Sequence, residues 1–570
     1  MKELNIAVSS EDSLQVQFSQ KICEEVNAQI RTFVENLKSC IANCEEGEII
    51  EILPTYCAVT VYFDSDKTNH SAVKKLIEAA LEKSDAGETA SNKGGKLVEI
   101  PVCYEDEEFA PDLADVAKHT GLSKEAVIKL HHSKDYLIYM LGFLPGFPYL
   151  GGMDELLETP RLETPRTKIP AGSVAIGGKQ AGLYPSDSPG GWRIIGRTPL
   201  KVFDQNRNPA CLYQAGDRIR FVPISKKQFE KMAAASSDGN ASSKNSSASF
   251  RPRAKAQYQK YVCTGGIKIL EPGLMTSVQD RGRAGFQHEG IGQSGVMDAE
   301  SFALGNSLLQ NEENAACLEA TALGPTISFI QDCEFVITGG EPGATLDEKT
   351  VYLNQKYFAP AGSVLKCGFI TKGLRSYICF KGGLLVPQLF GSRATNLKSK
   401  SGGYFGRKLK AGDEIAIGDM VRKGTAEPEG GSENIPLPIL QQMPSSSSEP
   451  LVLKCTKGSQ YSDFPLDVIR DFQDKVFTVL AESDRMGIRF SGESLKCGKT
   501  DIISDAIPFG AVQITSAGLP VVMAADRQTT GGYAKIAAVT RHSMCLLSQA
   551  VPGTKVTFKI ENTDNVRWHK

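Results

Sequence analysis

The spacing of apolar residues in the first part of the chain alternates between a helical and a strand-like pattern. Residues 14–37 and 70–83 place apolar side chains at helical spacing, which predicts two helices with one buried face each. Residues 49–63 and 97–104 are rich in β-branched and aromatic residues, which favour strands. This part of the chain therefore predicts a small α+β domain.

From Tyr136 onward the pattern changes, because short apolar runs alternate with turns that contain glycine and proline. Residues 141–152 and 170–178 show this most clearly. Many short strands with such turns are typical of a β-barrel or a β-sandwich. Residues 261–421 and 451–558 have the same β-rich character, and we see no short tandem repeat.

Two stretches have a composition that buries too little apolar surface to fold. Residues 233–257 begin with Ala, Ser, Asn and Gly and end with basic residues, and residues 424–450 are rich in Gly, Pro, Glu and Ser. Both predict flexible connections. The one clear helix candidate after them is residues 465–474. The fold class is therefore mixed α+β and mainly β, with a small α+β domain (1–100), a barrel (101–232), a linker (233–260), a second barrel (261–423), a flexible insert (424–450) and a third barrel (451–570).

The bulk composition is that of a soluble globular protein. The 570 residues carry a formal net charge of −2, which gives no reason to expect nucleic acid or a membrane surface as a partner. No apolar run approaches the roughly 18 residues that span a bilayer, and the first residues lack an apolar signal core, so we expect a cytoplasmic protein. The 14 cysteines contain no CxxC pair, which favours scattered reduced thiols over zinc or disulfides.

The first polar cluster consists of Arg161, Arg166 and Lys168. Three prolines stiffen this segment, and a rigid basic rim suits a phosphate or a carboxylate. An ordinary surface turn, paired with Glu158 and Glu163, explains the same residues equally well.

The second cluster covers residues 184–197. Its two adjacent glycines, Gly190 and Gly191, let a backbone approach a ligand closely, and its serines and Asp187 offer polar groups. A tight hairpin with Trp192 as a core plug is the better interpretation of the residues taken alone.

The third cluster contains Gln279, Asp280, Arg281 and Arg283, and Asp298 follows it. Asp280 and Asp298 are candidates to share a Mg²⁺ ion, which accepts one or two carboxylates together with water and phosphate oxygens. A salt bridge from Asp280 to Arg281 or Arg283 is the simpler interpretation.

The fourth cluster is residues 525–533, which combine an acid, a base, hydroxyls, two glycines and a phenol. The glycines can expose backbone N–H groups to an anion. No P-loop and no dinucleotide-binding glycine motif occurs in the chain. His131 and His132 stand apart, at the end of a short helix that Ser123 is expected to cap, and His131 is a candidate proton carrier.

Three motifs closely resemble the allophanate hydrolase subunit 1 family, which also contains KipI-type kinase inhibitors and the B subunit of 5-oxoprolinase. They are residues 142–152 (GFLPGFPYLGG), 164–174 (TPRTKIPAGSV) and 184–192 (YPSDSPGGW). The remainder resembles the allophanate hydrolase subunit 2 family, which includes KipA and the C subunit of 5-oxoprolinase. The residues that carry this second resemblance are 271–282, 294–298, 319–325, 391–395, 483–487 and 526–533.

The resemblance implies cyclophilin-like barrels, one in the first half and two in the second. It also implies a component of an ATP-dependent 5-oxoprolinase, which opens 5-oxo-L-proline to L-glutamate with ATP, Mg²⁺ and the LamB/YcsF-type 5-oxoprolinase component as partner. The same pair of modules forms the carboxyltransferase region of urea carboxylase, but this chain has no Met-Lys-Met biotin acceptor, so no covalently bound biotin is expected. Homo-oligomers are compatible with all of these expectations.

Combined with the clusters, the resemblance assigns roles to residues. His131, Lys168, Asp280 and Asp526 are the expected catalytic residues, and Asp280 and Asp298 are the expected metal ligands. The expected substrate- and ATP-binding residues are Arg166, Ser173, Tyr184, Ser188, Arg197, Gln279, Arg281, Asp298, Arg527, Thr529, Thr530 and Tyr533. Three other functions stay open. They are a biotin-dependent carboxyltransferase that acts on urea or a related amide, a fusion of a histidine-kinase inhibitor with its antagonist, and a small-molecule binding module without catalysis.

Overall fold

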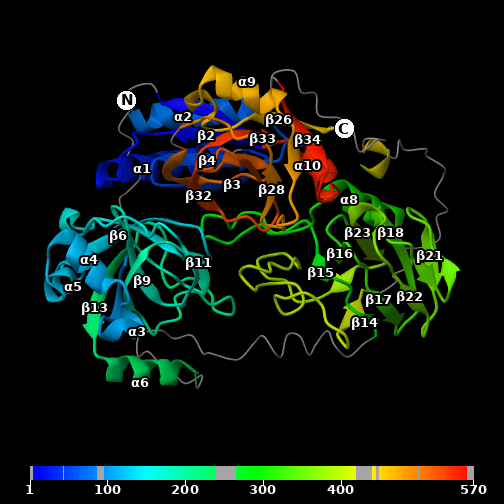
Figure 1. Ribbon diagram of the computed structural model, residues 1–570, viewed down its shortest axis with the longest axis horizontal. Coiled ribbons are helices and arrows are strands. Elements are labelled where there is room, and N and C mark those ends of the chain that lie inside the picture. The colour runs from blue at the N-terminus through cyan, green and yellow to red at the C-terminus, as the bar shows by residue number, and fades with distance from the viewer. Residues whose placement is uncertain are drawn as a thin grey trace.

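The chain folds into four modules, which Figure 1 shows in chain order from blue to red. The computed structural model describes residues 4–42, 44–85, 95–237, 265–418, 439–443, 449–498 and 500–561. Each module buries an apolar cluster of its own. The fold class is the mixed α+β, mainly β type that the sequence predicts.

The N-terminal domain is a four-stranded antiparallel sheet with two helices. Its strand order is β1-β2-β4-β3, with β1 Asn5–Ser10, β2 Ser13–Gln17, β3 Ile49–Pro54 and β4 Ala58–Phe63. The helices are α1 Glu24–Ile41 and α2 His70–Asp85. The helix expected over 70–83 is confirmed, but the one expected from residue 14 begins at Glu24. Leu14 is apolar because it faces the core from a strand.

The first closed barrel follows, with strand order β10-β7-β6-β13-β5-β12-β9. Strand β5 crosses the expected boundary at residue 100 and belongs to the barrel, where it pairs in parallel with β13. The side chain of Ser123 accepts a hydrogen bond from the backbone N–H of Ala126, so the expected cap is confirmed. The barrel strands are β5 Leu97–Cys103, β6 Asp135–Leu141, β7 Pro148–Gly151, β9 Ser173–Gly177, β10 Gln180–Leu183, β12 Arg193–Arg197 and β13 Arg218–Ile224; β8 Arg166–Ile169 and β11 Ser188–Gly190 form a separate ribbon, and the helices are α3 Asp106–Phe109, α4 Leu113–Thr120, α5 Lys124–His131, α6 Lys226–Ser237 and the short η1 Glu155–Leu157.

The expected linker begins inside a helix. Helix α6 continues to Ser237, so residues 233–237 are helical, and residues 238–264 lie outside the described residues. Alanine has the highest helix propensity, which is why an Ala-rich run extends this helix.

The third module consists of two sheets, where the sequence predicts a barrel. The seven-stranded sheet has the order β20-β19-β22-β17-β14-β25-β24 and the five-stranded sheet β15-β16-β23-β18-β21. Helix α8 (Ala299–Leu308) packs against β18 and β23. The strands are β14 Ile267–Glu271, β15 Met275–Gln279, β16 Cys317–Thr321, β17 Thr326–Phe329, β18 Cys333–Glu341, β19 Thr345–Leu346, β20 Lys349–Thr350, β21 Lys356–Ala359, β22 Val364–Lys366, β23 Lys372–Phe380, β24 Leu384–Leu385 and β25 Glu414–Ile417.

The last module is a second closed barrel, with strand order β26-β33-β30-β31-β28-β27-β34. The helix predicted over 465–474 is confirmed as α9 (Leu466–Asp474), whereas α10 (Arg541–Ser548) is unexpected. Helix α10 is buried on almost every side, so it lacks the one-sided apolar pattern that reveals a surface helix. The strands are β26 Leu451–Lys457, β27 Phe477–Val479, β28 Gly487–Ser491, β30 Ala511–Ile514, β31 Pro520–Met523, β33 Lys535–Val539 and β34 Lys555–Ile560, with a ribbon of β29 Asp501–Ala506 and β32 Thr530–Tyr533 and the short helices η2 Ile439–Gln442 and η3 Tyr461–Asp463.

Part of the expected insert 424–450 lies within the described residues. The described part includes η2, whose Ile439 is buried in the core cluster of the second barrel, while residues 419–438 and 444–448 lie outside the described residues.

The two barrels are topological copies of each other. When both are followed from β10 and β31, the order β10-β7-β6-β13-β5-β12-β9 matches β31-β28-β27-β34-β26-β33-β30, and each barrel carries one extra two-stranded ribbon. A trace of this repeat remains in the sequence. The pair Ile169-Pro170 corresponds to Ile507-Pro508, and the pair Gly190-Gly191 corresponds to Gly531-Gly532. The repeat is too long and too divergent to be recognised as a tandem pattern.

The N-terminal domain packs on the second barrel, although the first barrel follows it in the chain (Figure 1). Buried Asp505 of the second barrel accepts hydrogen bonds from Gln15 at 2.8 Å and from Gln460 at 3.2 Å. The Asp505 carboxylate also accepts from the hydroxyl of Thr55 at 3.4 Å and pairs with the buried ammonium of Lys535 at 3.5 Å. The two ends of the chain are therefore tied by a buried polar contact.

In the part of the chain that the structure describes, no helix is long and apolar enough to cross a membrane. The cysteines of the same part are all free thiols, as their spacing predicts.

Cutting the chain between the two halves should not separate them. A protease site placed within residues 238–264 and then cleaved should leave both fragments in one peak on size-exclusion chromatography, because the N-terminal domain is held by the second barrel. Two separate peaks under native buffer conditions would contradict this packing.

Candidate functional site

The third and fourth predicted clusters meet between the two barrels. The segment between β15 and α8 crosses this region, and its Ser294 donates a backbone hydrogen bond to Ala525 at 3.1 Å. The same segment contacts the first barrel, where Gly146 donates to the carbonyl of Glu289 at 3.0 Å. Gly142 of the first barrel lies against Thr530, and a Cβ atom at that glycine would stand 2.4 Å from the Thr530 hydroxyl oxygen. The site therefore draws on three modules.

Arg166 and Lys168, both on ribbon strand β8, have different environments. The guanidinium of Arg166 forms a two-pronged ion pair with buried Asp112, with N–O distances of 2.7 and 2.8 Å. Arg166 thus fastens the ribbon to the start of α4. Lys168 is exposed and pairs with Asp187 at 3.2 Å, so its ammonium remains accessible to a ligand.

The other predicted residues of the first barrel lie mostly inside it. The Ser173 hydroxyl donates to the carbonyl of Pro170 at 2.8 Å, and Arg197 donates to the carbonyl of Ala171 at 3.0 Å. Tyr184 and Ser188 are buried, and the Ser188 hydroxyl has no hydrogen-bond partner among the described residues. Trp192 is buried in the aromatic cluster beside them, which confirms the core-plug interpretation.

His131 is a core residue, and its environment disfavours the expected role as proton carrier. Its ring is fully buried, stacks on Phe221 at a centroid distance of 4.6 Å and hydrogen-bonds the hydroxyl of Tyr104 at 2.9 Å. Burial lowers the pKa of His131 to about 3, so the ring stays neutral at working pH.

Asp280 is a structural acceptor. Its carboxylate accepts from the Ser392 hydroxyl at 2.6 Å, from the backbone N–H of Arg393 at 2.6 Å and from that of Gly282 at 2.8 Å. Arg281 points elsewhere and pairs with Glu313 at 3.1 Å, so the expected salt bridge between Asp280 and Arg281 is not formed. The carboxylate instead joins three loop segments.

Asp298 caps helix α8. It accepts from the backbone and the hydroxyl of Ser301, at 3.0 and 2.6 Å, and from Gln549 at 2.8 Å. Burial raises the pKa of Asp298, which disfavours the anionic form that would bind a cation. Because the oxygens of Asp280 and Asp298 are already bonded to protein donors, these residues do not fit a Mg²⁺ site. Among the described residues, no three potential metal ligands come together.

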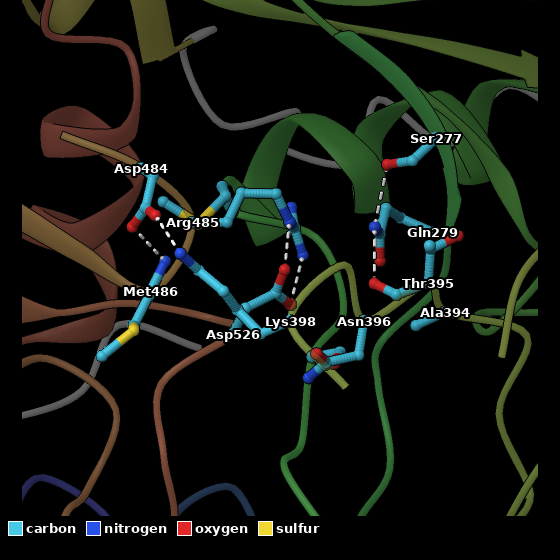
Figure 2. Close-up of polar contacts among 12 residues, drawn as sticks. Ser277, Gln279, Ala394, Thr395, Asn396, Lys398, Asp484, Arg485, Met486 and Asp526 are labelled. Carbon is cyan, nitrogen blue, oxygen red and sulfur yellow. Dashed lines mark hydrogen bonds and ion pairs between the residues drawn. The ribbon is translucent and has the colours of Figure 1, made fainter. Parts of the chain in front are cut away.

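Asp526 belongs to a buried network around Arg485, which Figure 2 shows. The guanidinium of Arg485 binds both oxygens of Asp526, at 3.1 and 3.2 Å, and also binds Glu319 of the third module. Glu319 accepts from the hydroxyl of Tyr377 at 3.0 Å. All these side chains are buried, and Arg485 occupies both carboxylate oxygens of Asp526, the expected catalytic residue.

Gln279, also shown in Figure 2, belongs to a neighbouring contact. Its amide nitrogen donates to the Ser277 hydroxyl at 2.9 Å and to the carbonyl of Thr395 at 3.1 Å. Gln279 is fully buried, so it supports the loop that bears Thr395.

Arg527 is buried between the second barrel and the crossing segment. It donates to the carbonyl of Ile507 at 2.8 Å and, over longer distances of 3.4 and 3.3 Å, to Gln287 and Gln293. The Gln287 amide in turn donates to Glu51 of the N-terminal domain at 3.2 Å. Arg527 therefore lies where the second barrel, the third module and the N-terminal domain meet. Asp526 lies between the second barrel and the third module.

The remaining predicted residues differ in exposure. Thr529 and Thr530 are buried, and the Thr529 hydroxyl has no hydrogen-bond partner in the described structure. Tyr533 is exposed.

Several residues at this junction were missed as site residues. Tyr56, from the loop between β3 and β4, enters the aromatic cluster of the first barrel. Arg485 and Lys535 are fully enclosed charges. Lys535 could have been found, because a lysine inside an apolar strand needs a buried partner. Tyr56 gives no such signal, since its contact depends on how two modules pack.

Replacing Arg485 should destabilise the protein strongly. Arg485→Met leaves Glu319 and Asp526 as buried carboxylates without a cation, which costs about 3–5 kcal/mol of unfolding free energy. Urea unfolding would measure the loss. Arg220→Met, which removes an exposed pair with Asp135, should cost much less, because solvent screens an exposed ion pair. Equal losses for the two variants would show that the buried network contributes little.

Comparison with known proteins assigns the two halves of the chain to one family. The carboxyltransferase domain, subdomain C and D, matches residues 4–213, and the carboxyltransferase domain, subdomain A and B, matches residues 289–560. A solved crystal structure of the protein TTHA0988 is 29% identical, with a TM-score of 0.77, and covers 96% of this chain and 99% of its own.

Curated relatives match the halves separately. The B subunit of 5-oxoprolinase from Bacillus subtilis is 42% identical over 216 residues, which are 36% of this chain and 88% of the relative. The C subunit of 5-oxoprolinase from Haemophilus influenzae is 35% identical over 296 residues, 51% of this chain and 90% of the relative. The urea amidolyase of Saccharomyces cerevisiae is 29% identical over 303 residues, but these are only 16% of that protein. The chain therefore belongs to the carboxyltransferase domain family and joins in one polypeptide the counterparts of the B and C subunits of 5-oxoprolinase.

Proposed function

We propose that this chain is the fused B and C component of an ATP-dependent 5-oxoprolinase, which opens 5-oxo-L-proline to L-glutamate with a separate LamB/YcsF-type protein. The observation that carries the proposal is the near full-length match of each half to its counterpart, 88% of a B subunit and 90% of a C subunit. The interlocked modules support it, because the junction draws residues from both halves.

The proposed chemistry activates a poor electrophile. Transfer of the terminal phosphoryl group of ATP to the lactam oxygen gives an imidate-like phosphate. Water then adds to its carbon, the ring C–N bond breaks and the nitrogen takes up a proton, which leaves an acyl phosphate on the former lactam carbon. A second water hydrolyses this acyl phosphate to glutamate and inorganic phosphate. Exposed Lys168 is the candidate for the phosphate, because its ammonium is near the surface of the ribbon. A magnesium ion that accompanies ATP would need ligands other than Asp280 and Asp298.

Biotin-dependent carboxyl transfer is the second candidate, because the matching family is a carboxyltransferase domain and a urea amidolyase is among the relatives. A kinase inhibitor fused to its antagonist is less well supported. The N-terminal domain is packed on the second barrel through Asp505, so release of an inhibitor would require a buried contact to open.

The decisive assay mixes this protein with its LamB/YcsF-type partner and ATP. We expect release of ADP and glutamate that depends on 5-oxo-L-proline and is unaffected by avidin. Without turnover in the presence of an active partner, the proposal fails. Activity that avidin abolishes would favour the carboxyltransferase.

Lys168→Met should lower turnover at least tenfold while leaving the unfolding free energy nearly unchanged, because an exposed ion pair contributes little stability. Lys179→Met is the matched control, since Lys179 is equally exposed and pairs with the partly exposed Glu158 at 3.7 Å. Full activity of the Lys168 variant would remove Lys168 from the site.

A further inference from the structure

Arg161 differs from the other arginines of the first barrel in its polar contacts. Seven arginines lie between residues 161 and 220, and six of them bind carboxylates or backbone carbonyls. Arg161 alone among these seven forms no hydrogen bond or ion pair with any residue that the structure describes. Its planar guanidinium is exposed and can accept a ligand with paired oxygen atoms.

The guanidinium of Arg161 is nevertheless held in place. Its central carbon lies 5.7 Å from the centre of the Trp192 ring, and that ring is fixed in the core beside Phe147. The backbone is anchored on both sides, because Arg193 donates to the carbonyl of Pro160 at 3.3 Å and Leu162 donates to that of Gly191 at 2.7 Å. A side chain that is already positioned loses less entropy when a ligand binds.

Three phenols share the aromatic cluster of Trp192, the ring on which Arg161 lies. They belong to Tyr56 of the N-terminal domain and to Tyr149 and Tyr184 of the first barrel. The ring centroid of Tyr149 is 6.3 Å from that of Trp192, and Tyr184 is linked to Trp192 through Phe147. The rings of Tyr56 and Tyr149 are 5.7 Å apart between centroids, and the Tyr149 hydroxyl lies beside Thr530 of the second barrel. Burial raises the pKa of all three phenols, so they remain protonated and can donate hydrogen bonds.

Tyr56 supplies an independent sign of a ligand. Its side chain is fully buried, and its hydroxyl has no hydrogen-bond partner in the described structure. A buried hydroxyl without a partner destabilises a folded protein, so such groups are rare unless water or a ligand satisfies them. The side chains around Tyr56 are mostly aromatic and include a few polar groups. This composition is typical of a small-molecule site.

We propose that Arg161, Tyr56, Tyr149 and Tyr184 form a subsite for a small cyclic amide that carries a carboxylate, with the guanidinium binding the carboxylate and the phenols binding the amide. This subsite rests on the proposed function, because 5-oxo-L-proline has these two groups on one five-membered ring. It goes further by assigning substrate recognition to the first barrel, completed by Tyr56 of the N-terminal domain.

Calorimetric titration of the full chain with two ligands tests the subsite. We expect 5-oxo-L-proline to bind and pyrrolidin-2-one, which lacks the carboxylate, to bind at least tenfold more weakly. Arg161→Met should weaken binding of 5-oxo-L-proline about tenfold or more and leave that of pyrrolidin-2-one unchanged. Tyr56→Phe should weaken both ligands, because it removes a donor to the amide they share.

Matched controls separate recognition from folding. Arg220→Met removes another guanidinium of the first barrel, one that pairs with Asp135. Tyr139→Phe removes another phenol hydroxyl of the same barrel, and the charges that act on this hydroxyl include those of Glu24 and Arg218. Both controls should bind as the unaltered protein does. Equal binding of the two ligands, no binding by the unaltered chain, or full binding by Arg161→Met would each overturn the subsite.

The outcome is distinguishable from failure of the proposed function. If the Arg161 variant binds normally while the complete assembly still opens the lactam, the subsite is wrong and the proposed function stands. If Arg161-dependent binding is found but no ring opening occurs with an active partner, the subsite stands and the reaction is wrong.

Discussion

The guanidinium of Arg485 is enclosed by Asp526 of the second barrel and Glu319 of the third module. A buried charge is tolerated only where opposite charges and hydrogen bonds compensate its lost hydration. Because the two carboxylates come from different modules, neither module can shift without leaving a charge exposed to an apolar interior. The contact extends through the hydroxyl of Tyr377, which binds Glu319 at 3.0 Å and accepts from the backbone of Asp298 at 2.8 Å. The junction between these modules is therefore fixed.

The same principle holds the N-terminal domain. Asp505 and Lys535 form a buried pair on the second barrel, and Gln15 reaches it from the N-terminal sheet. A domain that belongs by sequence to the first half is thereby attached to the last. This packing explains how the counterparts of two separate subunits are held together in one folded chain.

The interlocked arrangement creates a composite region between the barrels. Gly142 and Tyr149 of the first barrel meet Thr530 of the second, and Tyr56 is inserted from the N-terminal domain. The three carboxylates expected to do chemistry, Asp280, Asp298 and Asp526, instead hold this region together. Near this region the guanidinium of Arg161 has no polar partner among the described residues, and the ammonium of Lys168 is exposed.

The sequence by itself determined the fold class, the α2, α5 and α9 helices, and the family, because these depend on local periodicity, caps and contiguous motifs. It did not determine that the third module is two open sheets, that the barrels share one topology, or that α10 is a helix, since buried elements lose the pattern that solvent imposes. Nor could it separate structural from accessible charges. In the sequence, Asp526 and Lys168 are both charged residues within family motifs. Only the tertiary packing shows that Arg485 binds the carboxylate of Asp526 while the ammonium of Lys168 is exposed to solvent. Whether a charged side chain serves the fold or a ligand depends on partners that lie far away in the chain, and folding alone brings them together.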